Sequence, residues 1–466
     1  MPIGYQTIIG LEVHVELATV SKMFCGCSAE HFGVEPNTHT CPVCLGLPGA
    51  LPVPNKKAID WTLMLAMALD CRINQHSHFD RKNYFYPDLP KGYQITQFEE
   101  PFGYDGCLKL TAIKSALMST VSQQKVIRIR RVHLEEDTGK LQHTEIGGEK
   151  VTLVDFNRSG VPLVEIVTEP DFRSLEEVDL YLKKLQKIIR YLGISQADME
   201  KGSMRIEPSI SIRVNKNNGQ IQFPMPNDQL PDYRVELKNI NSFRFARKAL
   251  EYEIKRQTDL LEKGEKIPQQ TRGWNEEKNV TFPQREKEEA HDYRYFPEPD
   301  IPPIVLDNEQ LAIIKKQIPE LPDQKLVRFQ RDYSLSDYDA GILTENQELG
   351  DYFEEAVKAA GEIGQLKTGN IVKTIANWLI NKRIETENTL PAELIAKIIR
   401  ANTIAAVDEG KLSGIVKEVL GANKQAVNDY QKGKKTALGF LMGAVIKLLP
   451  GVDKELIRKE LEKQLF

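Results

Sequence analysis

Residues 8–17 read IIGLEVHVEL, and this stretch decides the fold of the first part of the chain. Side chains along an extended strand alternate between its two faces. Four apolar side chains therefore share one face: Leu11, Val13, Val15 and Leu17. Three polar side chains share the other: Glu12, His14 and Glu16. The apolar face can pack on a core, whereas the polar face is either a solvated surface or one wall of a site for a hard cation, and the strand alone leaves both open.

Other segments are predicted to extend this strand into a sheet. Residues 204–214 alternate strictly between apolar and polar side chains, and so do residues 234–240, which read RVELKNI. Two helices are also well marked. Ser174 and Glu177 form a capping box before an apolar period that stops at Gly193, and a second helix starts near residues 241–242 and ends by Gly264. The first part of the chain is therefore predicted to be an α+β domain.

Domain boundaries are indicated by changes in composition. Four prolines lie within residues 296–303 and indicate a linker after a first domain at 1–297. Helical periodicity without strands follows and predicts an all-helical domain at 298–405. The last residues, 406–466, are rich in Lys and Ala and are predicted to form a small helical tail domain.

The composition is ordinary for a globular protein of 466 residues, with 41% hydrophobic and 27% charged residues. The formal net charge of -4 argues against coating of nucleic acid over the whole surface but allows a local basic patch. We find no apolar run long enough to span a bilayer and no signal peptide, so we expect a cytoplasmic protein without a membrane partner.

Four of the six cysteines fall in two pairs, Cys25-x-Cys27 and Cys41-x-x-Cys44, inside a loop rich in Pro and Gly. Four thiolates at this spacing can surround a zinc ion tetrahedrally, which would make the site structural because it has no open position. The alternative is four unrelated thiols. Cys71 and Cys107 stand alone and are predicted to be packing residues.

Acidic residues suggest a second metal site. Glu165 interrupts the two-sided apolar strand at residues 161–167, where a carboxylate needs a cation or a charged partner. Residues 133–140, HLEEDTGK, bring three carboxylates to a turn, which could also be a solvated acidic loop. Together with His14, Glu165 and Glu136 would give oxygen ligands and one nitrogen, a set that suits magnesium or manganese.

A basic and aromatic stretch, DRKNYFYPD at residues 80–88, contains Lys82. A lysine beside a metal site is what a polyphosphate requires, although an aromatic core turn with a surface Arg–Lys pair is an equal alternative. The sequence has no P-loop and no G-x-G-x-x-G, so a nucleotide site would be of another type. It also has no G-x-S-x-G and no cysteine placed as a nucleophile, so amide hydrolysis by this chain is not expected.

Several segments together resemble one family along the whole chain, the B subunit of the aspartyl/glutamyl-tRNA amidotransferase. They are GLEVHVEL (10–17), SKMF (21–24), DRKNYFYPDLPKGYQITQ (80–97), HLEEDTGK (133–140), DFNRSGVPLVEIVTEPD (155–171), MRIEPSISIR (204–213), VELKNINSF (235–243) and DYRYFPEPDIPP (292–303).

The resemblance implies an ATP- and magnesium-dependent enzyme that converts Glu-tRNA(Gln) to Gln-tRNA(Gln), Asp-tRNA(Asn) to Asn-tRNA(Asn), or both. The side-chain carboxylate would be phosphorylated, and ammonia would displace the phosphate. An amidase (glutaminase) partner, the A subunit, would supply the ammonia through a channel, and a small C subunit would clamp the other two. The implied fold is an antiparallel-sheet cradle similar to glutamine synthetase, followed by a helical domain and a tail that grips tRNA.

The resemblance also implies roles for individual residues of this sequence. The expected magnesium ligands are His14, Glu136 and Glu165, with Glu12 close by. Lys82 would meet the nucleotide phosphates, with Arg158, Arg205 and Arg213 as further groups for ATP or the acyl intermediate. The four cysteines match the zinc-binding members. Four lysines of the tail could contact tRNA phosphates, or could belong to a solvated helix face: Lys432, Lys434, Lys435 and Lys447.

Two other functions compete with this one. The chain could be a ligase that acts on a free amino acid, but the basic helical tail argues against so small a substrate. It could instead be a zinc-stabilised RNA-binding scaffold without catalysis, which would leave the carboxylate of Glu165 in an apolar strand unexplained.

Overall fold

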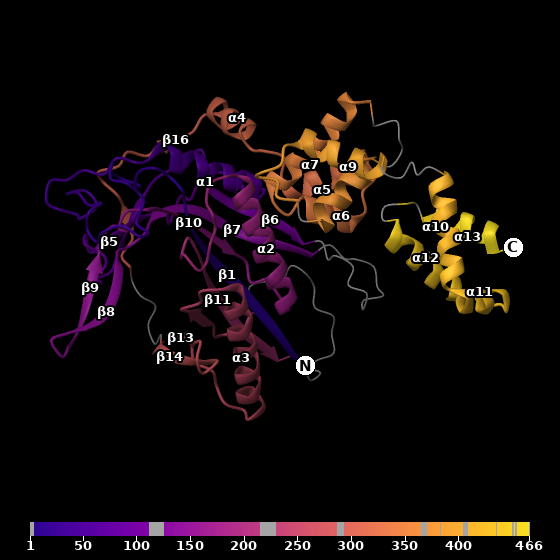
Figure 1. The fold of residues 1–466 in the computed structure, drawn as a ribbon. Helices are drawn as coiled ribbons and strands as arrows, with labels where there is room; N and C mark the ends of the chain where they lie inside the picture. Colours follow the sequence, from indigo (N-terminus) through magenta and orange to yellow (C-terminus); the bar gives the residue numbers. More distant parts are fainter. Residues whose placement is uncertain are drawn as a thin grey trace. The chain divides into compact units, whose positions relative to one another are not determined.

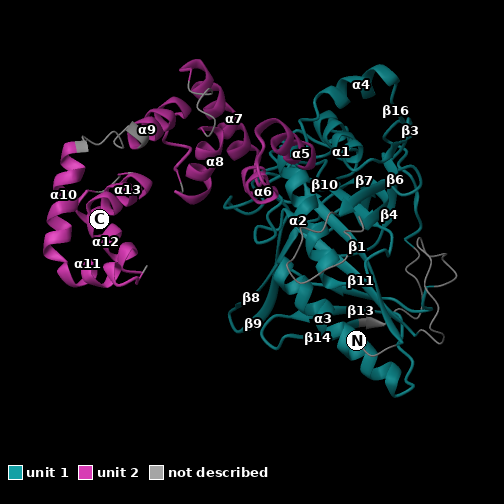
Figure 2. Cartoon of the chain, turned by 90° about the vertical axis from the view of Figure 1, so that its right-hand side faces the viewer, with its two compact units in different colours: residues 1–322 teal, residues 323–466 magenta. Residues whose placement is uncertain are grey.

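The computed structural model describes residues 4–110, 125–214, 230–286, 293–364, 371–382, 384–403, 409–434, 436–449, 452 and 454–465 (Figure 1). The chain divides into two compact units, residues 1–322 and 323–466 (Figure 2). The first contains the sheet and the second is helical, so the expected mixture of a large sheet with helices, followed by helices alone, is confirmed. The boundaries predicted at 297/298 and 405/406 stay predictions.

Within the described residues, the first unit is built on a nine-stranded sheet. Its strands pair antiparallel except for β12 and β13, which are parallel. The order across the sheet is β14 (Val280–Glu286), β13 (Gln270–Asn275), β12 (Val235–Lys238), β11 (Met204–Val214), β1 (Tyr5–Glu16), β10 (Pro162–Thr168), β7 (Lys125–Glu136), β6 (Gly103–Leu110) and β2 (Arg72–Ile73).

Strand β1, which opened the sequence analysis, lies in the middle of this sheet, between β10 and β11. The apolar side chains of residues 11, 13, 15 and 17 are at most 2% exposed and belong to the main core. Apolar residues of three helices pack in the same core: α1 (Lys56–Ala68), α2 (Leu175–Tyr191) and α3 (Phe243–Glu262). Because these helices take the apolar face, the opposite face of the sheet keeps the row of charged groups.

The helix ends follow the predicted capping signals. The Ser174 hydroxyl accepts a hydrogen bond from the Glu177 amide, whereas the Glu177 carboxylate accepts from the amide of Arg173 at 2.7 Å. Ser242 caps α3 by accepting from the Phe245 amide. Both helices are followed closely by a glycine with positive φ, Gly193 and Gly264, as a left-handed C-terminal turn requires.

The segment 296–303, predicted to be a linker, and the two residues that follow it are instead tied to the first unit by two short strands. β15 (Phe296–Pro297) pairs with β4 (Asp80–Asn83), which also pairs with β5 (Tyr93–Thr96). β16 (Ile304–Val305) pairs with β3 (His76–Ser77). Prolines end long elements but are tolerated in edge strands, where no partner needs the missing amide. A separate hairpin is formed by β8 (Lys140–Ile146) and β9 (Glu149–Asp155). Helix α4 (Asn308–Lys316) then follows.

The second unit contains two hydrophobic clusters in its described residues. The first is built by α5 (Pro322–Tyr333), α6 (Asp337–Leu343), α7 (Gln347–Glu362), α8 (Ile371–Asn381) and α9 (Pro391–Thr403). The second is built by α10 (Glu409–Ala422), α11 (Lys424–Gln431), α12 (Thr436–Leu448) and α13 (Lys454–Leu465). Among the described helices, none has the length and apolar character needed to cross a bilayer.

Candidate metal and nucleotide site

Strand register brings an imidazole and two carboxylates together on the polar face of the sheet. His14 of β1 lies opposite Glu165 of β10, which in turn lies opposite His133 of β7. The Nε2 atom of His14 is 3.5 Å from Glu165 Oε2 and 3.7 Å from Glu135 Oε1. The metal-ligating atoms of His14, Glu135 and Glu165 all lie within 4.8 Å of one another. We refer to these three residues as the His14 cluster.

Electrostatics within the His14 cluster show that its charges depend on one another. Burial alone would lower the pKa of His14, but the charge and hydrogen bond of Glu165 and the charge of Glu135 raise it to about 9. Burial opposes ionisation of Glu165 too, yet His133 and His14 hold its pKa well below the usual value. Burial and the charge of Glu165 raise the pKa of Glu135.

A divalent cation fits the chemistry of this cluster. Glu135 and Glu165 are nearly buried, at 3% and 8% exposure, and carboxylates are seldom held this way without a positive partner. Two carboxylates with one imidazole form a donor set for magnesium or manganese. A bound cation would take over the charge balance that the protonated imidazole of His14 supplies without it, and binding would release that proton.

Lys82 of β4 places a fixed positive charge beside the cluster. Burial alone would lower its pKa, but the negative charge of Glu135, followed by other neighbours that include Glu165, raises it. Its ammonium lies 5.1 Å from the centre of the Tyr293 ring and 5.7 Å from that of Tyr84. Carboxylates and aromatic faces therefore both hold this lysine in its charged form.

Next to the cluster, two arginines converge on Asp137. Arg205 pairs with Asp137 and, at 2.6 Å, with Glu16, while Arg158 Nε lies 3.6 Å from Asp137 Oδ2. Arg205 lies opposite His14 in the β1–β11 register. Burial opposes ionisation of Asp137, but the charges of Arg205 and Arg158 lower its pKa. Asp137 thereby holds the positive charge of Arg205 on the strand next to β1 and that of Arg158 in the loop before β10.

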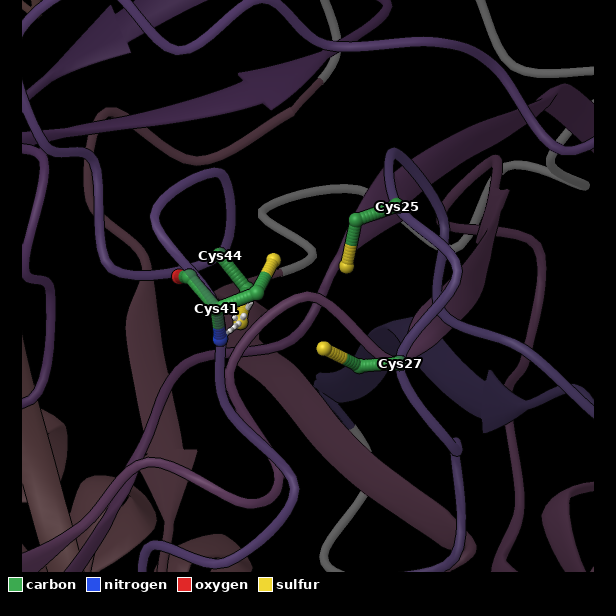
Figure 3. A group of neighbouring side chains, drawn as sticks. All are labelled: Cys25, Cys27, Cys41 and Cys44. Atoms are coloured by element: carbon green, nitrogen blue, oxygen red, sulfur yellow. Dashed lines mark hydrogen bonds between the residues drawn. The ribbon is translucent and has the colours of Figure 1, made fainter.

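The four paired cysteines form a second donor group. Their Sγ atoms lie within 4.8 Å of one another and face a shared space (Figure 3). All four are free thiols, and the amide of Cys41 donates to Cys44 Sγ at 3.1 Å. A hydrogen bond from Cys25 lowers the pKa of Cys44 to about 4, and the charge of buried Lys22 adds to this. Four thiol groups so placed fit a structural metal of the zinc type.

The cysteine loop also supports a buried ion pair. Gly46, which follows the second cysteine pair, has a φ of +65° and packs so closely on Lys91 that a Cβ atom would collide with the lysine side chain. Lys91 Nζ lies 2.5 Å from Glu136 Oε1. Position 46 therefore needs glycine for both its backbone conformation and this contact. A cavity of about 220 Å³ is lined by these three residues together with Cys25 and Cys44.

Comparison with known proteins identifies the family. A family model described as the GatB/GatE catalytic domain matches residues 7–312, and a model described as the GatB domain matches residues 344–465. The chain belongs to the GatB family. This confirms the family, and the class of enzyme component, that the sequence motifs predicted.

Curated members of the GatB family match the chain over its whole length. Proteins named as the B subunit of aspartyl/glutamyl-tRNA(Asn/Gln) amidotransferase are 43% identical in Caldicellulosiruptor saccharolyticus and 44% identical in Carboxydothermus hydrogenoformans. Each alignment covers 98% of this chain and 99% of the relative. The protein of the same name in Thermomicrobium roseum is 44% identical over 99% of both chains.

Glu136, expected to bind magnesium in this GatB-family chain, does not lie with His14 and Glu165; Glu135 takes that place. β7 continues as a regular strand through both glutamates, so they point to opposite faces. Glu136 instead pairs with Lys91 and accepts a hydrogen bond from the Ile95 amide at 3.0 Å. Alternation also puts His133 on the face of Glu135. The motif HLEE at residues 133–136 indicates this arrangement, because its first and third residues, His133 and Glu135, share one face of a strand.

Glu12 lies in a neighbouring acidic group and not in the His14 cluster itself. Its carboxylate is within 4.8 Å of ligand atoms of Glu207 and Glu236, and Lys238 Nζ is 2.9 Å from Glu207 Oε2. Burial, followed by the charges of Glu165, Glu207 and Glu236, raises the pKa of Glu12 to about 7. The polar face of the sheet therefore carries two neighbouring groups of carboxylates, one in the His14 cluster and one around Glu12.

The remaining predicted groups are dispersed. Arg213 lies eight residues along β11 from Arg205, roughly 27 Å away at the usual rise per residue, so it is not part of the cluster. In the tail, Lys432 and Lys447 are exposed, and Lys434 pairs with Asp429 at 3.2 Å. Lys435 lies outside the described residues.

Proposed function

We propose that this GatB-family chain is the kinase and transamidase component of a tRNA-dependent amidotransferase. It would use ATP to phosphorylate the side-chain carboxylate of glutamate on tRNA(Gln), of aspartate on tRNA(Asn), or of both. Ammonia would then displace phosphate and leave the amide. A carboxylate is a poor acyl donor because oxide is a poor leaving group, and phosphorylation removes that obstacle.

The observation that carries this proposal is the His14 cluster with the charge of Lys82 beside it. Phosphoryl transfer needs little covalent chemistry from a protein and relies on positioning and on stabilisation of charge at the phosphate oxygens. A preformed cationic side chain next to a divalent-cation ligand set is the arrangement that such a reaction requires. Names of the curated relatives, which specify aspartyl/glutamyl-tRNA, support the choice of acceptor.

The side chains of this chain would act as follows. His14, Glu135 and Glu165 would hold magnesium, which supplies charge neutralisation for the phosphate oxygens when bound. Lys82 would contact the transferred phosphoryl group. Glu12 would extend the negative field that attracts the magnesium accompanying ATP.

The arginines would contribute at a distance from the transferred group. Arg158 and Arg205, both held by Asp137, would add positive charge next to the acyl phosphate. Arg213, further along β11, would contribute only if ATP extends in that direction.

Several further parts of the proposal concern the assembly. An amidase partner, the A subunit, would generate the ammonia, because the sequence has no G-x-S-x-G motif and no cysteine placed as a nucleophile. A small C subunit would hold the complex together. The cysteine loop would bind structural zinc. The antiparallel sheet with its charged face would act as a cradle of the glutamine synthetase kind, and the tail at 406–466 would grip tRNA.

The test is a reconstitution. The chain, co-purified with its partner subunits, should form ADP only when ATP and mischarged tRNA are both present, and should form the amide only when an ammonia source is added as well. Supplying Glu-tRNA(Gln) and Asp-tRNA(Asn) separately would identify the substrate. Product formation that proceeds equally well with free glutamate or aspartate in place of the aminoacyl-tRNA would contradict the proposal.

A further inference from the structure

Two aromatic rings and one guanidinium group form a stack beside the His14 cluster. Phe98 and Tyr295 lie face to face, with ring centres 3.9 Å apart and an angle of 8° between the ring planes. The guanidinium carbon of Arg131 lies 5.5 Å from the centre of the Phe98 ring. We refer to these three residues as the aromatic column.

Three segments that are distant in the sequence build the aromatic column. Phe98 follows β5 by two residues, and its amide donates to a carboxylate of β4 at 2.8 Å. Tyr295 directly precedes β15, which pairs with the same strand β4. Arg131 belongs to β7 and shares a face of that strand with His133 and Glu135, because alternate residues point the same way. The column therefore lies one row along β7 from the His14 cluster.

Two features of the column indicate a ligand. The Phe98 side chain is 41% exposed although it is large and apolar. The Nε atom of Arg131 is buried and has no hydrogen-bond partner among the described residues, while its Nη1 atom donates to the Phe98 carbonyl at 3.5 Å, a long contact. A buried donor without an acceptor is unfavourable, so an anionic or polar ligand at this place would satisfy it.

The chemistry of the column suits one nucleotide with an unpaired base. Exposed aromatic rings stack on nucleobases of any sequence, and a guanidinium group binds phosphate. The column is also in a positive field, because the charges of Lys82 and Arg131 lower the pKa of Tyr295 while burial, the larger effect, raises it. A free amino acid would leave the rings unused, whereas a nucleotide would use both the rings and the arginine.

The column is close enough to the reaction site for a substrate to reach both. The Tyr293 ring lies 5.9 Å from the Tyr295 ring, and the ammonium group of Lys82 lies 5.1 Å from the Tyr293 ring. An amino acid esterified to a terminal ribose places its side-chain carboxylate about nine bonds, or roughly 10 Å, from the base. A base on the column would therefore allow that carboxylate to approach Lys82.

We propose that the aromatic column binds the unpaired 3′-terminal nucleotide of the aminoacyl-tRNA. The inference rests on the proposed function, because it assumes that the carboxylate on tRNA reacts at the His14 cluster. ATP also carries an adenine base, so the experiment has to separate the terminal adenosine of tRNA from the adenosine of ATP.

The test removes one ring in the complete complex. Phe98→Leu should raise the KM for aminoacyl-tRNA about tenfold, because the terminal base loses its stacking partner, and should leave the KM for ATP unchanged. Phe98→Tyr keeps the ring and should stay within about twofold of wild type for both substrates. Phe282→Leu is the matched control, since Phe282 on β14 is 39% exposed and lies outside the column, and it should change neither KM.

A truncated tRNA identifies the nucleotide that is bound. Uncharged tRNA without its terminal adenosine should inhibit the wild-type complex about tenfold more weakly than complete uncharged tRNA, and Phe98→Leu should abolish this difference. A difference that persists in Phe98→Leu would overturn the inference, and so would a rise in the KM for ATP alone. Absence of ATP-dependent product in the wild-type complex would instead refute the proposed function itself.

Discussion

At the scale of single residues, the two neighbouring glutamates of β7 have different surroundings. Glu135 lies within ligand distance of His14 and Glu165, whereas Glu136 pairs with Lys91 on the other face. We expect Glu135→Gln to weaken binding of Mn²⁺, a reporter for magnesium, by about 10–100-fold, since an amide oxygen carries no charge to replace the lost carboxylate. Calorimetric titration of the purified complex measures this.

Glu136→Gln is the matched control for this prediction. It removes the same charge one residue away, and Mn²⁺ affinity should stay within about twofold of wild type, since its carboxylate is directed away from the cation. The cluster assignment would fail if Glu136→Gln weakened Mn²⁺ binding while Glu135→Gln did not.

Much of this site could be predicted from the sequence, and the part that could not has a physical cause. Glu165 was identified because an acid in an apolar strand needs a partner, and the register places it opposite His14. Glu136 was expected as a ligand because of the family resemblance, and strand alternation would favour Glu135 only if β7 stays regular through both residues. A Gly turn follows closely in HLEEDTGK, and the sequence does not show that β7 stays regular through both residues. The contact of Lys91 with Gly46 joins distant loops and leaves no local signal.

At the scale of secondary-structure elements, α3 is joined to the sheet by a buried carboxylate. Glu253 of α3 is fully buried, and its carboxylate lies 2.8 Å from Arg256 and 3.1 Å from Arg272 of β13. We expect Glu253→Gln to lower the free energy of unfolding of the first unit at pH 7 by about 3 kcal/mol, because two arginines lose their partner. Urea unfolding, followed by the emission of the buried Trp274 of β13, measures this.

The effect of Glu253→Gln should depend on pH in a defined direction. Burial opposes ionisation of Glu253, but its bonds with Arg256 lower its pKa in the folded protein. Its contribution is therefore complete above the unfolded value of about 4.3 and is lost as the pH falls through the lower folded value. The difference between wild type and variant should shrink below about pH 4. Glu251→Gln, at an exposed position of the same helix, should leave the free energy of unfolding unchanged both at pH 7 and below about pH 4.

The cysteine loop gives a prediction about metal content. Purified chain should contain one zinc ion, and Cys41→Ser should lose it and lower the melting temperature, because the loop then lacks its cross-link. Cys107→Ser is the control, since Cys107 lies outside the loop and should leave the zinc content unchanged. Elemental analysis with thermal unfolding decides the matter, and full zinc content in Cys41→Ser would contradict the assignment.

Individual elements were predicted well where local signals were strong. β11 spans residues 204–214 as the alternating pattern predicts, and α2 and α3 begin after Ser174 and Ser242. The pairing of these strands could not be predicted, because β1 meets β10 and β11, each more than 140 residues away. The segment 296–303 was interpreted as a linker because prolines end regular elements, and the sequence does not show that β4 offers residues 296–297 an edge to pair with.

At the scale of the whole molecule, the tail can be tested by removal. Its buried residues, from Leu412 to Leu465, form a hydrophobic cluster of their own, so deletion of 406–466 should not open another core. We expect the deletion to raise the KM for aminoacyl-tRNA about tenfold or more, because contacts to the tRNA phosphates are lost. The KM for ATP should be unchanged, because the tail does not take part in ATP binding. Steady-state kinetics of the reconstituted complex measures both values.

A milder variant controls for loss of the whole domain. Replacing the exposed Lys432 and Lys447 by glutamine removes their charges and keeps a polar side chain, and it should weaken tRNA binding mainly at low salt. Equal efficiency of the deleted and complete chains would favour a ligase for a free amino acid instead.

The contact between Gly46 and Lys91 has a consequence for how this protein responds to its surroundings. Lys91 packs against the cysteine loop at Gly46, and its ammonium group pairs with Glu136 of β7, the strand that also carries Glu135. If these thiols hold the proposed zinc, chelators or oxidants that release it would free the loop that packs on Lys91, beside the strand of the proposed magnesium site. Loss of that zinc would then lower the rate of the proposed amidation, although no proposed magnesium ligand had changed.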